Sequence, residues 1–274
     1  MPMRTVFWLT LLLIIRPLSG QEPPEQAIAP YPAHAHNDYN HERPLFDAME
    51  HQFRSIEADV FSRGDSLYVA HNRRDIGPGR TLRTLYLDPL RSHLAAGGGT
   101  LYNSTGPLIL LIDIKDNGLS TYRQLDRILR DYRDMLCSAT PEGIIPGRVM
   151  VIVSGNRPIE YMMDQDLRFA FVDGRLQDLS APYPASLMPL VSDNWANYFS
   201  WSGVGEMPLE ESVKLRKYVN QAHENGQLIR FWATEDRPGE KRDAVWTLLL
   251  EAGVDLINTD DLEGLQSFII AHRP

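Results

Sequence analysis

The chain has 274 residues, of which 43% are hydrophobic and 9% aromatic, enough for one sizeable hydrophobic core. Its formal net charge is −9, and this acidic balance argues against a nucleic-acid partner and against electrostatic docking on anionic lipid. Cys137 is the single cysteine, so an intrachain disulfide is excluded and the core must stabilise the fold.

The first twenty residues have the pattern of a secretory signal peptide. Arg4 lies in a short basic N-terminal region, and an apolar run covers residues 5–15. The sequence Pro-Leu-Ser-Gly at residues 17–20 then precedes a polar segment. The apolar run is too short to cross a bilayer, which takes about 20 residues. We therefore predict that residues 1–20 are removed and that the mature protein is secreted or periplasmic, monomeric and not inserted in a membrane. A retained N-terminal anchor is the alternative.

The mature chain is predicted to be one domain. Residues 21–30 are rich in Pro and Glu and are predicted to be a flexible leader, whereas residues 31–274 contain no linker, repeat or low-complexity stretch. Short apolar runs alternate there with longer segments, at 31–34, 55–60, 108–114, 148–153, 169–173, 188–192, 228–232 and 255–259. Eight such strands predict an α/β fold, a single TIM-type (β/α)8 barrel with its reactive groups at the C-terminal ends of the strands.

Helical periodicity is clearest in three of the longer segments, 121–136, 210–224 and 241–252. Ser120 is the predicted N-cap of the first, because a short hydroxyl side chain there can accept a backbone hydrogen bond. Gly226 and Gly253 are the predicted stops of the other two.

Two carboxylates share one face of the second predicted strand. In Ser55-Ile-Glu-Ala-Asp-Val-Phe61, Glu57 and Asp59 point to one side and the apolar residues between them to the other. Because the apolar face suits the helical layer, both carboxylates are predicted to turn into the barrel. Confined like charges need a cation or a proton between them, and a hard divalent ion with oxygen ligands meets that need. A pair of solvated carboxylates on a sheet edge is the alternative.

The third predicted strand repeats this arrangement. In Leu110-Leu-Ile-Asp-Ile-Lys115, Asp113 and Lys115 share one face at the end of a strongly apolar run. A third carboxylate would complete a metal site, and the lysine beside it would hold a phosphate oxygen as a point charge. A structural Asp–Lys ion pair is the alternative.

Histidines end two other extended segments. His34 and His36 stand in Ala33-His-Ala-His-Asn-Asp38, after the first predicted strand, and His71 ends Val69-Ala-His-Asn72. Imidazole is the side chain best suited to exchange protons near neutral pH, so His34 and His71 are the predicted acid and base. Three roles remain open for His36: a metal ligand, a hydrogen-bond donor to the phosphate, or a supporting group behind the site. The remaining histidines are predicted to be surface residues: His41, His51, His93, His223 and His272.

Taken in order, these motifs resemble those of the phospholipase-C-like phosphodiesterase superfamily, which includes glycerophosphodiester phosphodiesterases and sphingomyelinase D. The likeness is greatest to the branch of the fungal altered-inheritance-of-mitochondria proteins, and it extends over nearly the whole mature chain. The segments that carry it are His34-Ala-His-Asn-Asp-Tyr39, Arg43-Pro-Leu-Phe46, Arg80-Thr-Leu82, Leu85-Tyr-Leu87 and Ala-Gly-Val-Asp-Leu-Ile-Asn-Thr-Asp-Asp261.

The resemblance implies a TIM barrel with one divalent cation, Mg²⁺ or Ca²⁺, and it implies roles for single residues. The implied metal ligands are Glu57, Asp59 and Asp113. The implied catalytic residues are His34, His71 and Lys115, with Lys115 contacting the phosphate. The residues expected to contact the substrate around them are His36, Asn37 and Trp232.

Such residues are suited to cleave a small-molecule or lipid phosphodiester. The metal and Lys115 would hold the nonbridging oxygens, one histidine would take a proton from the nucleophile, and the other would protonate the leaving alkoxide. The nucleophile is either water or a hydroxyl of the substrate, which would first form a cyclic phosphate. The predicted function is a secreted metal-dependent phosphoric diester hydrolase.

Two other function classes compete with this one. Amidohydrolase-like metal hydrolases also begin with His-x-His on a barrel, but they need histidines at the ends of later strands, and after His93 only His223 and His272 remain. A non-catalytic barrel that binds carbohydrate or protein predicts erosion of the acidic or histidine set, and both sets are complete.

Aromatic residues gather late in the chain, with Trp195, Tyr198, Phe199 and Trp201 after the sixth predicted strand and Phe231 and Trp232 at the end of the seventh. They are compatible with an apolar lip for a lipid tail or a sugar face, and equally with packing over the barrel mouth.

Overall fold

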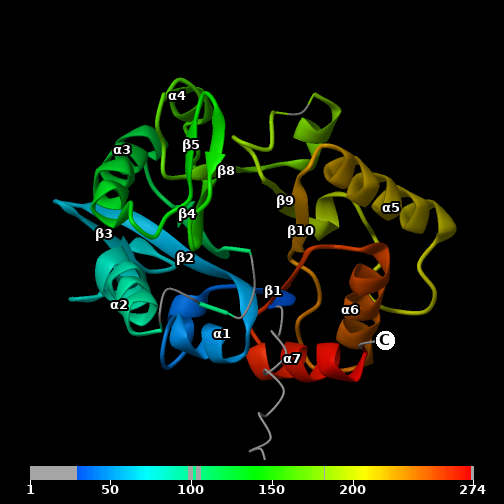
Figure 1. Cartoon of the computed structure of the whole chain (residues 1–274). Coiled ribbons are helices and arrows are strands. Elements are labelled where there is room, and N and C mark those ends of the chain that lie inside the picture. Colours follow the sequence, from blue (N-terminus) through cyan, green and yellow to red (C-terminus); the bar gives the residue numbers. More distant parts are fainter. Residues whose placement is uncertain (1–29, 98–100, 103–105, 182, 273–274) are drawn as a thin grey trace, which may run out of the picture.

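Eight parallel strands close into a barrel in the computed structural model, which describes residues 30–97, 101–102, 106–181 and 183–272. In order around the ring, the strands are β1 (Tyr31–Ala35), β2 (Phe53–Arg63), β4 (Leu108–Ile114), β7 (Val149–Gly155), β8 (Phe171–Gly174), β9 (Leu190–Asn194), β10 (Leu228–Trp232) and β11 (Leu256–Thr259). β1 pairs with both β2 and β11, which closes the ring (Figure 1). The predicted TIM-type barrel is confirmed. The predicted signal peptide and nearly all of the leader lie outside the described residues.

Three further strands of the described chain lie outside the ring. β3 (Ser66–Val69) runs antiparallel to the end of β2, after a turn in which Gly64 has a φ of 60°. This hairpin returns the chain to the barrel rim, where His71 follows β3. β5 (Ser138–Thr140) and β6 (Gly143–Ile145) form a separate small hairpin.

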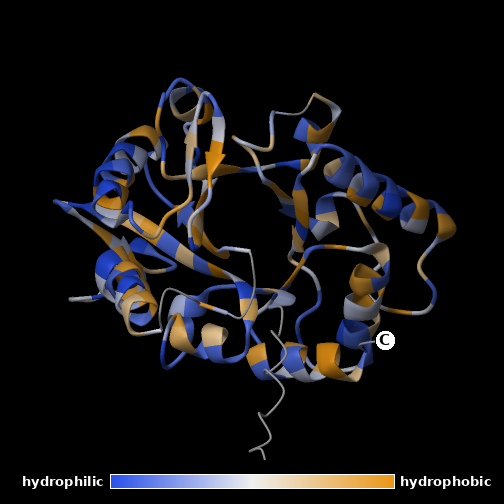
Figure 2. Ribbon diagram, viewed as in Figure 1, coloured by the Kyte–Doolittle hydropathy of each residue, from blue (hydrophilic) through white to orange (hydrophobic). Residues whose placement is uncertain are grey.

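Side chains on the barrel strands alternate between the interior of the ring and the helical layer. On β4, Leu110 and Ile112 join the large core under the helices, whereas Ile109 and Leu111 belong to a separate cluster inside the barrel. Phe171 and Leu190 from β8 and β9 share that interior cluster, which forms an apolar floor. In Figure 2 the alternation is visible along β2 as changes between orange and blue.

Above this floor, the next inward-facing position on most strands is polar. These positions hold Glu57, Asp113, Ser154, Asp173, Ser192, Arg230 and Asn258. The alternation of side chains along the strands therefore builds a polar layer at the C-terminal end of the barrel, directly over the apolar floor.

The helices surround the ring (Figure 1). They are α1 (Phe46–Glu50), α2 (Asp88–Ala96), α3 (Gly118–Leu129), α4 (Ile159–Met163), α5 (Leu209–Glu224), α6 (Glu240–Ala252) and α7 (Leu262–Ala271). The start of α3 differs from the prediction, because Asn117 rather than Ser120 is the N-cap and accepts a hydrogen bond of 3.0 Å from the Ser120 amide. α3 is also shorter than predicted, and a 3₁₀ turn carries on only to Tyr132. Gly253 ends α6 as predicted, with a φ of 80°.

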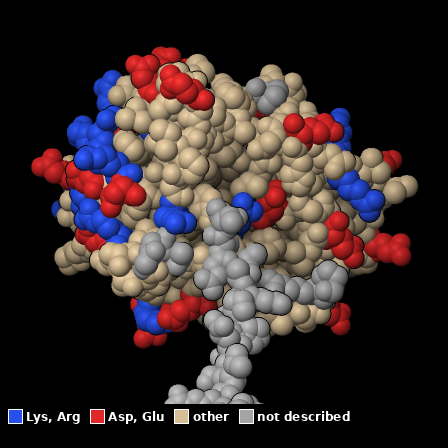
Figure 3. Space-filling model, in the orientation of Figure 1, with Lys and Arg blue, Asp and Glu red and all other residues tan. Residues whose placement is uncertain are grey.

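Charged side chains of both signs are interleaved on the outside of the barrel. Over α2 and α3, at the left of Figure 3, Lys or Arg side chains lie among Asp or Glu side chains. Ion pairs join Arg83 to Asp131, Arg91 to Asp88 and Arg130 to Asp126. The first two pairs are exposed, and exposed ion pairs contribute little to stability. In the described part of the chain, we find no helix that is long and apolar enough to cross a membrane.

Candidate active site

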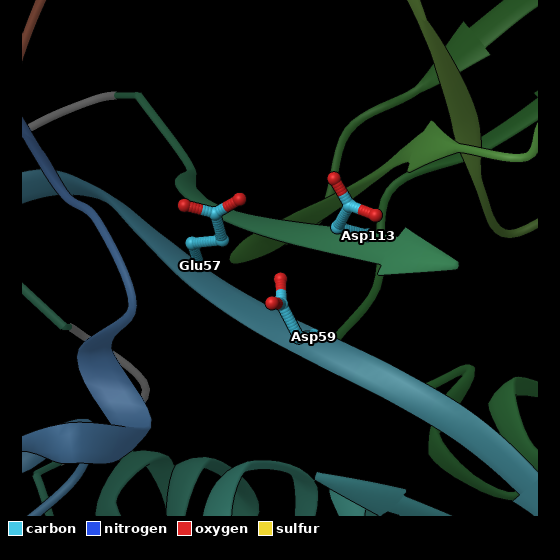
Figure 4. A group of neighbouring side chains, drawn as sticks. All are labelled: Glu57, Asp59 and Asp113. Carbon is cyan, nitrogen blue, oxygen red and sulfur yellow. The ribbon is translucent and has the colours of Figure 1, made fainter. Parts of the chain in front are cut away.

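Three carboxylates meet at the C-terminal ends of β2 and β4. Glu57 and Asp59 on β2 and Asp113 on β4 each offer an oxygen, and these oxygens lie within 4.8 Å of one another. Figure 4 shows the three side chains pointing into one space. Asp59 and Asp113 are register partners, and Glu57 lies two residues earlier on the same face of β2. The structure thus brings together the three predicted metal ligands.

This donor set fits a hard divalent cation. Mg²⁺ and Ca²⁺ bind carboxylate oxygens at about 2.0–2.6 Å, so three oxygens this close can share one ion after small side-chain rotations. Asp59 Oδ1 is buried and has no hydrogen-bond partner among the described residues, which leaves it available as a ligand. Gly155 preserves the space, because a Cβ atom there would lie 2.3 Å from Asp113 Oδ1.

The carboxylates repel one another in a buried setting. Burial, together with the charge of Glu57, raises the pKa of Asp59 to about 6. Burial also raises the pKa of Asp113, against the opposing effect of Lys115. Burial disfavours ionisation of Glu57 as well, but the hydrogen bond from His34 and the nearby positive charges, that of Arg230 among them, together outweigh it and lower the pKa of Glu57. A bound cation would relieve this repulsion.

Lys115 lies between two of the carboxylates. Its Nζ is 3.0 Å from Asp59 Oδ2 and 3.3 Å from Asp113 Oδ1, and the side chain also lines the cavity above them. Burial alone would lower the pKa of Lys115, but these two carboxylates raise it, so the amine is a cation. The ion pair considered as an alternative is therefore present, and the same ammonium is within reach of a ligand in the cavity.

His71 stands at the rim beside the acidic group. Its Nδ1 is 3.2 Å from Asp59 Oδ2 and 3.3 Å from the hydroxyl of Tyr39, and its side chain is 57% exposed. Tyr39 donates to Asp59 Oδ2 at 2.8 Å and was not singled out from the sequence. The ring is thus held at one edge while the opposite nitrogen is free to meet a ligand.

His34 is placed differently. It is fully buried, with Nδ1 2.7 Å from Ser55 Oγ and Nε2 3.3 Å from Glu57 Oε2. Burial, reinforced by the charge of Arg230, lowers the pKa of His34 to about 4, so the ring is neutral at pH 7. A carboxylate can only accept, so Nε2 carries the proton and Nδ1 accepts from the Ser55 hydroxyl.

His36 and Asn37 complete the loop after β1. His36 Nδ1 lies 2.9 Å from Asp260 Oδ1, and Nε2 lies 3.9 Å from Glu57 Oε2. Asn37 has a φ of 47°, a left-handed conformation that asparagine tolerates well. The backbone N–H of Asn37 donates to Glu57 Oε2 at 3.4 Å. This turn therefore directs both the His36 ring and a backbone donor towards the metal ligand.

A cavity of about 230 Å³ opens over these groups. Its walls are formed by His36, Glu57, His71, Asp113, Lys115, Ser154, Arg175, Arg230 and Trp232. Six of these were predicted as site residues, and Ser154, Arg175 and Arg230 were missed. Arg230 has a signal in the sequence, because it precedes Trp232 by two residues on a strand and must share its face.

The aromatic segment after β9 does not form a lip at this cavity. Trp195 and Phe199 are each 4% exposed, and Trp201 is 9% exposed. Trp195 and Phe199 stack with ring centroids 4.1 Å apart, and both pack edge-on against Phe231. These rings therefore pack into the core, whereas Trp232 at the end of β10 lines the cavity.

Comparison with known proteins identifies the family. Residues 24–173, more than half of the chain, match the model of the AIM6-like phosphodiesterase domain. The chain belongs to this family. A second match, to the glycerophosphoryl diester phosphodiesterase family, covers residues 229–263 and thus Trp232 and β11. The resemblance predicted from the ordered motifs is confirmed.

Relatives of this AIM6-like protein match over most of its length. It is 30% identical over 268 residues to the altered inheritance of mitochondria protein 6 homolog of Arthroderma benhamiae, covering 89% of this chain and 85% of the relative. It is 28% identical over 306 residues to altered inheritance of mitochondria protein 6 of Saccharomyces cerevisiae, covering 93% and 77%. The crystal structure of a glycerophosphoryl diester phosphodiesterase from Parabacteroides distasonis has the same fold, with a TM-score of 0.55, 14% identity and coverage of 90% and 89%.

Proposed function

We propose that this AIM6-like protein is a secreted or periplasmic, metal-dependent phosphoric diester hydrolase that acts on a glycerophosphodiester or phospholipid-type substrate. The convergence of Glu57, Asp59 and Asp113 beside Lys115 and His71 on one cavity carries the proposal. Export is inferred from residues 1–20 alone. Because all of the cavity walls except Trp232 are polar or charged, the phosphate and a compact polar group would occupy the cavity, and any acyl chain would lie outside it.

Different side chains at the cavity would hold the metal, contact the phosphate and transfer protons. Glu57, Asp59 and Asp113 would hold one Mg²⁺ or Ca²⁺ ion, which when bound supplies positive charge to the phosphate oxygens. Lys115 would hold a nonbridging oxygen as a point charge. Of His71, exposed to the cavity, and His34, below it, one would take a proton from the nucleophile and the other would protonate the leaving alkoxide.

The two competing function classes receive less support. The later histidines that an amidohydrolase-like site needs lie elsewhere, because His223 on α5 bonds Asp255 and His272 follows α7 and bonds the Phe268 carbonyl. A non-catalytic barrel gives no reason for three carboxylates, two of them buried, to share one space at a cost in repulsion.

The first experiment tests the activity and its metal dependence together. Glycerophosphodiesters, phosphatidylinositol, sphingomyelin and lysophospholipids are incubated with the protein in Mg²⁺, in Ca²⁺ and in excess EDTA. We expect turnover of at least one diester, its loss in EDTA, and its return when the cation is restored. Cation at about 100 times its dissociation constant should also stabilise the fold by about 2.7 kcal/mol, seen as a higher melting temperature.

Asp59→Asn and Asp75→Asn provide the matched pair for this experiment. Asp75 is an exposed carboxylate in the loop after His71, outside the cavity. Asp59→Asn should abolish both the turnover and the thermal shift, while Asp75→Asn should keep both. Full activity in EDTA, or a thermal shift that survives Asp59→Asn, would contradict the proposed metal site.

The role of His34 is tested separately, because its ring reaches the cavity only past Glu57. A cation that takes Glu57 as a ligand competes with His34 for the same carboxylate, which would free Nε2 for proton transfer. We therefore expect His34→Ala to lower turnover by about 10² to 10⁴-fold even at saturating metal.

A purely supporting role makes a different prediction for the same variant. If His34 only orients Glu57, metal affinity should fall by about 10 to 100-fold and excess metal should restore turnover. The measurement is turnover against metal concentration for His34→Ala and His36→Ala. A larger loss in His36→Ala would show that the other histidine of the pair is the acid or base.

A further inference from the structure

Arg230 is a buried cation that forms no ion pair with any described carboxylate. Arg230 is 3% exposed and lies on the inward face of β10. Its guanidinium donates to Asn258 Oδ1 at 3.1 Å and to Ser192 Oγ at 3.5 Å, and its Nε has no partner among the described residues. A guanidinium has five N–H donors, and a buried charge without a counter-charge is strongly unfavourable. Two neutral partners leave most of this demand unmet.

Two other arginines of the described chain do form ion pairs. Arg175, which is partly buried and also lines the cavity, pairs with Asp173 at 2.9 Å. Arg242 at the edge of α6 pairs with Asp261 at 2.6 Å. Arg175 therefore has a carboxylate in direct contact, and Arg230 has none among the described residues.

The barrel places Arg230 opposite the acidic group. β10 lies four strands from β4 in either direction around the ring of eight, so Arg230 and Asp113 occupy opposite walls. Both line the same cavity of about 230 Å³. A ligand that fills this cavity meets carboxylates and Lys115 on one side and, on the other, a guanidinium that forms no ion pair.

The charges on the two walls define what such a ligand must carry. One divalent cation and Lys115 together would neutralise Glu57, Asp59 and Asp113. Arg230 then remains as a single positive charge facing the cavity, and a phosphodiester carries a single negative charge. A planar guanidinium also matches two oxygens of a phosphate in a bidentate arrangement.

We propose that Arg230 is a substrate-binding residue that holds a nonbridging oxygen of the phosphate from the wall opposite the metal ligands. This inference rests on the proposed function for the identity of the ligand, a phosphate group. Arg230 on β10 would thus contact the side of the phosphate that is turned away from the metal and Lys115. Ser192 and Asn258 orient the guanidinium towards the cavity without neutralising it.

The test measures binding rather than turnover. Inorganic phosphate is titrated calorimetrically into the Mg²⁺-saturated protein and into Arg230→Met, after the Mg²⁺ affinity of each has been measured alone. We expect Arg230→Met to bind phosphate about 10 to 100-fold more weakly, because the variant loses one charge-assisted hydrogen bond to the ligand. Its Mg²⁺ affinity should be unchanged. Should Arg230→Met not fold, Arg230→Lys replaces it, because it keeps the charge but loses the fork and should bind phosphate several-fold more weakly.

Arg168→Met is the matched control. Arg168 is also buried, at 7% exposure, its Nε is likewise unpartnered, and it donates to the backbone carbonyl of Ser186 away from the cavity. Arg168→Met should bind phosphate like the unsubstituted protein. Equal phosphate affinity in the Arg230 variants, or no phosphate binding by the unsubstituted protein, would overturn the inference. Binding of Mg²⁺ and phosphate without cleavage of any diester would instead count against the proposed function alone.

Discussion

His71→Ala is expected to lower turnover by about 10² to 10⁴-fold while leaving the melting temperature nearly unchanged. The ring lies on the cavity wall, 57% exposed, so its removal takes away a proton carrier and little packing. Its Nδ1 faces Asp59 and Tyr39, which holds one nitrogen while the other meets the substrate. The measurements are steady-state turnover of the diester found in the screen, its pH profile, and thermal unfolding.

His93→Ala is the control for that variant. His93 lies on α2, outside the cavity, and its substitution should leave turnover unchanged. Loss of an acid or base should also remove one limb of the pH profile, whereas loss of a structural contact should leave its shape intact. Near-normal turnover in His71→Ala would remove this residue from the proposed mechanism.

Lys115→Met is expected to lower turnover by about 10² to 10³-fold, because it removes a positive charge that faces the developing charge on the phosphate. The structure adds a condition to the stability result. Without metal, Lys115 is the cation that pairs with both Asp59 and Asp113, so its loss should destabilise the metal-free protein by up to about 3–5 kcal/mol. With Mg²⁺ bound, the ion takes over that charge, and the melting temperature should be close to that of the unsubstituted protein.

Two measurements separate a phosphate contact from a simple ion pair. Turnover and melting temperature are compared for Lys115→Met and for Lys214→Met, which removes an ammonium from α5 that donates to the Tyr198 carbonyl outside the cavity. Lys214→Met should keep turnover. If Lys115→Met is strongly destabilised even with Mg²⁺, yet the folded fraction retains its activity, Lys115 is an ion-pair partner and does not act on the phosphate.

The sequence by itself determined the strands and the direction of the side chains on them. A strand has a period of two residues, so Glu57 with Asp59, and Asp113 with Lys115, had to share a face whatever the rest of the chain does. The apolar residues between them had to face the helices. Because parallel strands in a barrel end at the same rim, the two pairs could be expected to meet, and they do.

The depth of each side chain could not be predicted in this way. His34 and His71 look equivalent in the sequence, each at the end of an extended segment. In the structure His34 is buried below Glu57, whereas His71 reaches the surface because the long hairpin of β2 and β3 returns the chain to the rim. Periodicity gives the direction of a side chain, and the length and pairing of the strands decide how deep it lies.

Only the tertiary structure decided that Arg230 forms no ion pair. Arg175 pairs with Asp173, which lies two residues earlier in the sequence, whereas the partners of Arg230 are the neutral side chains of Ser192 on β9 and Asn258 on β11. The partners of Arg230 depend on which strands become neighbours and in what register, and those contacts join residues far apart in the sequence. Local pattern carries no information on such contacts, so the charged wall opposite the carboxylates became visible only once the barrel was closed.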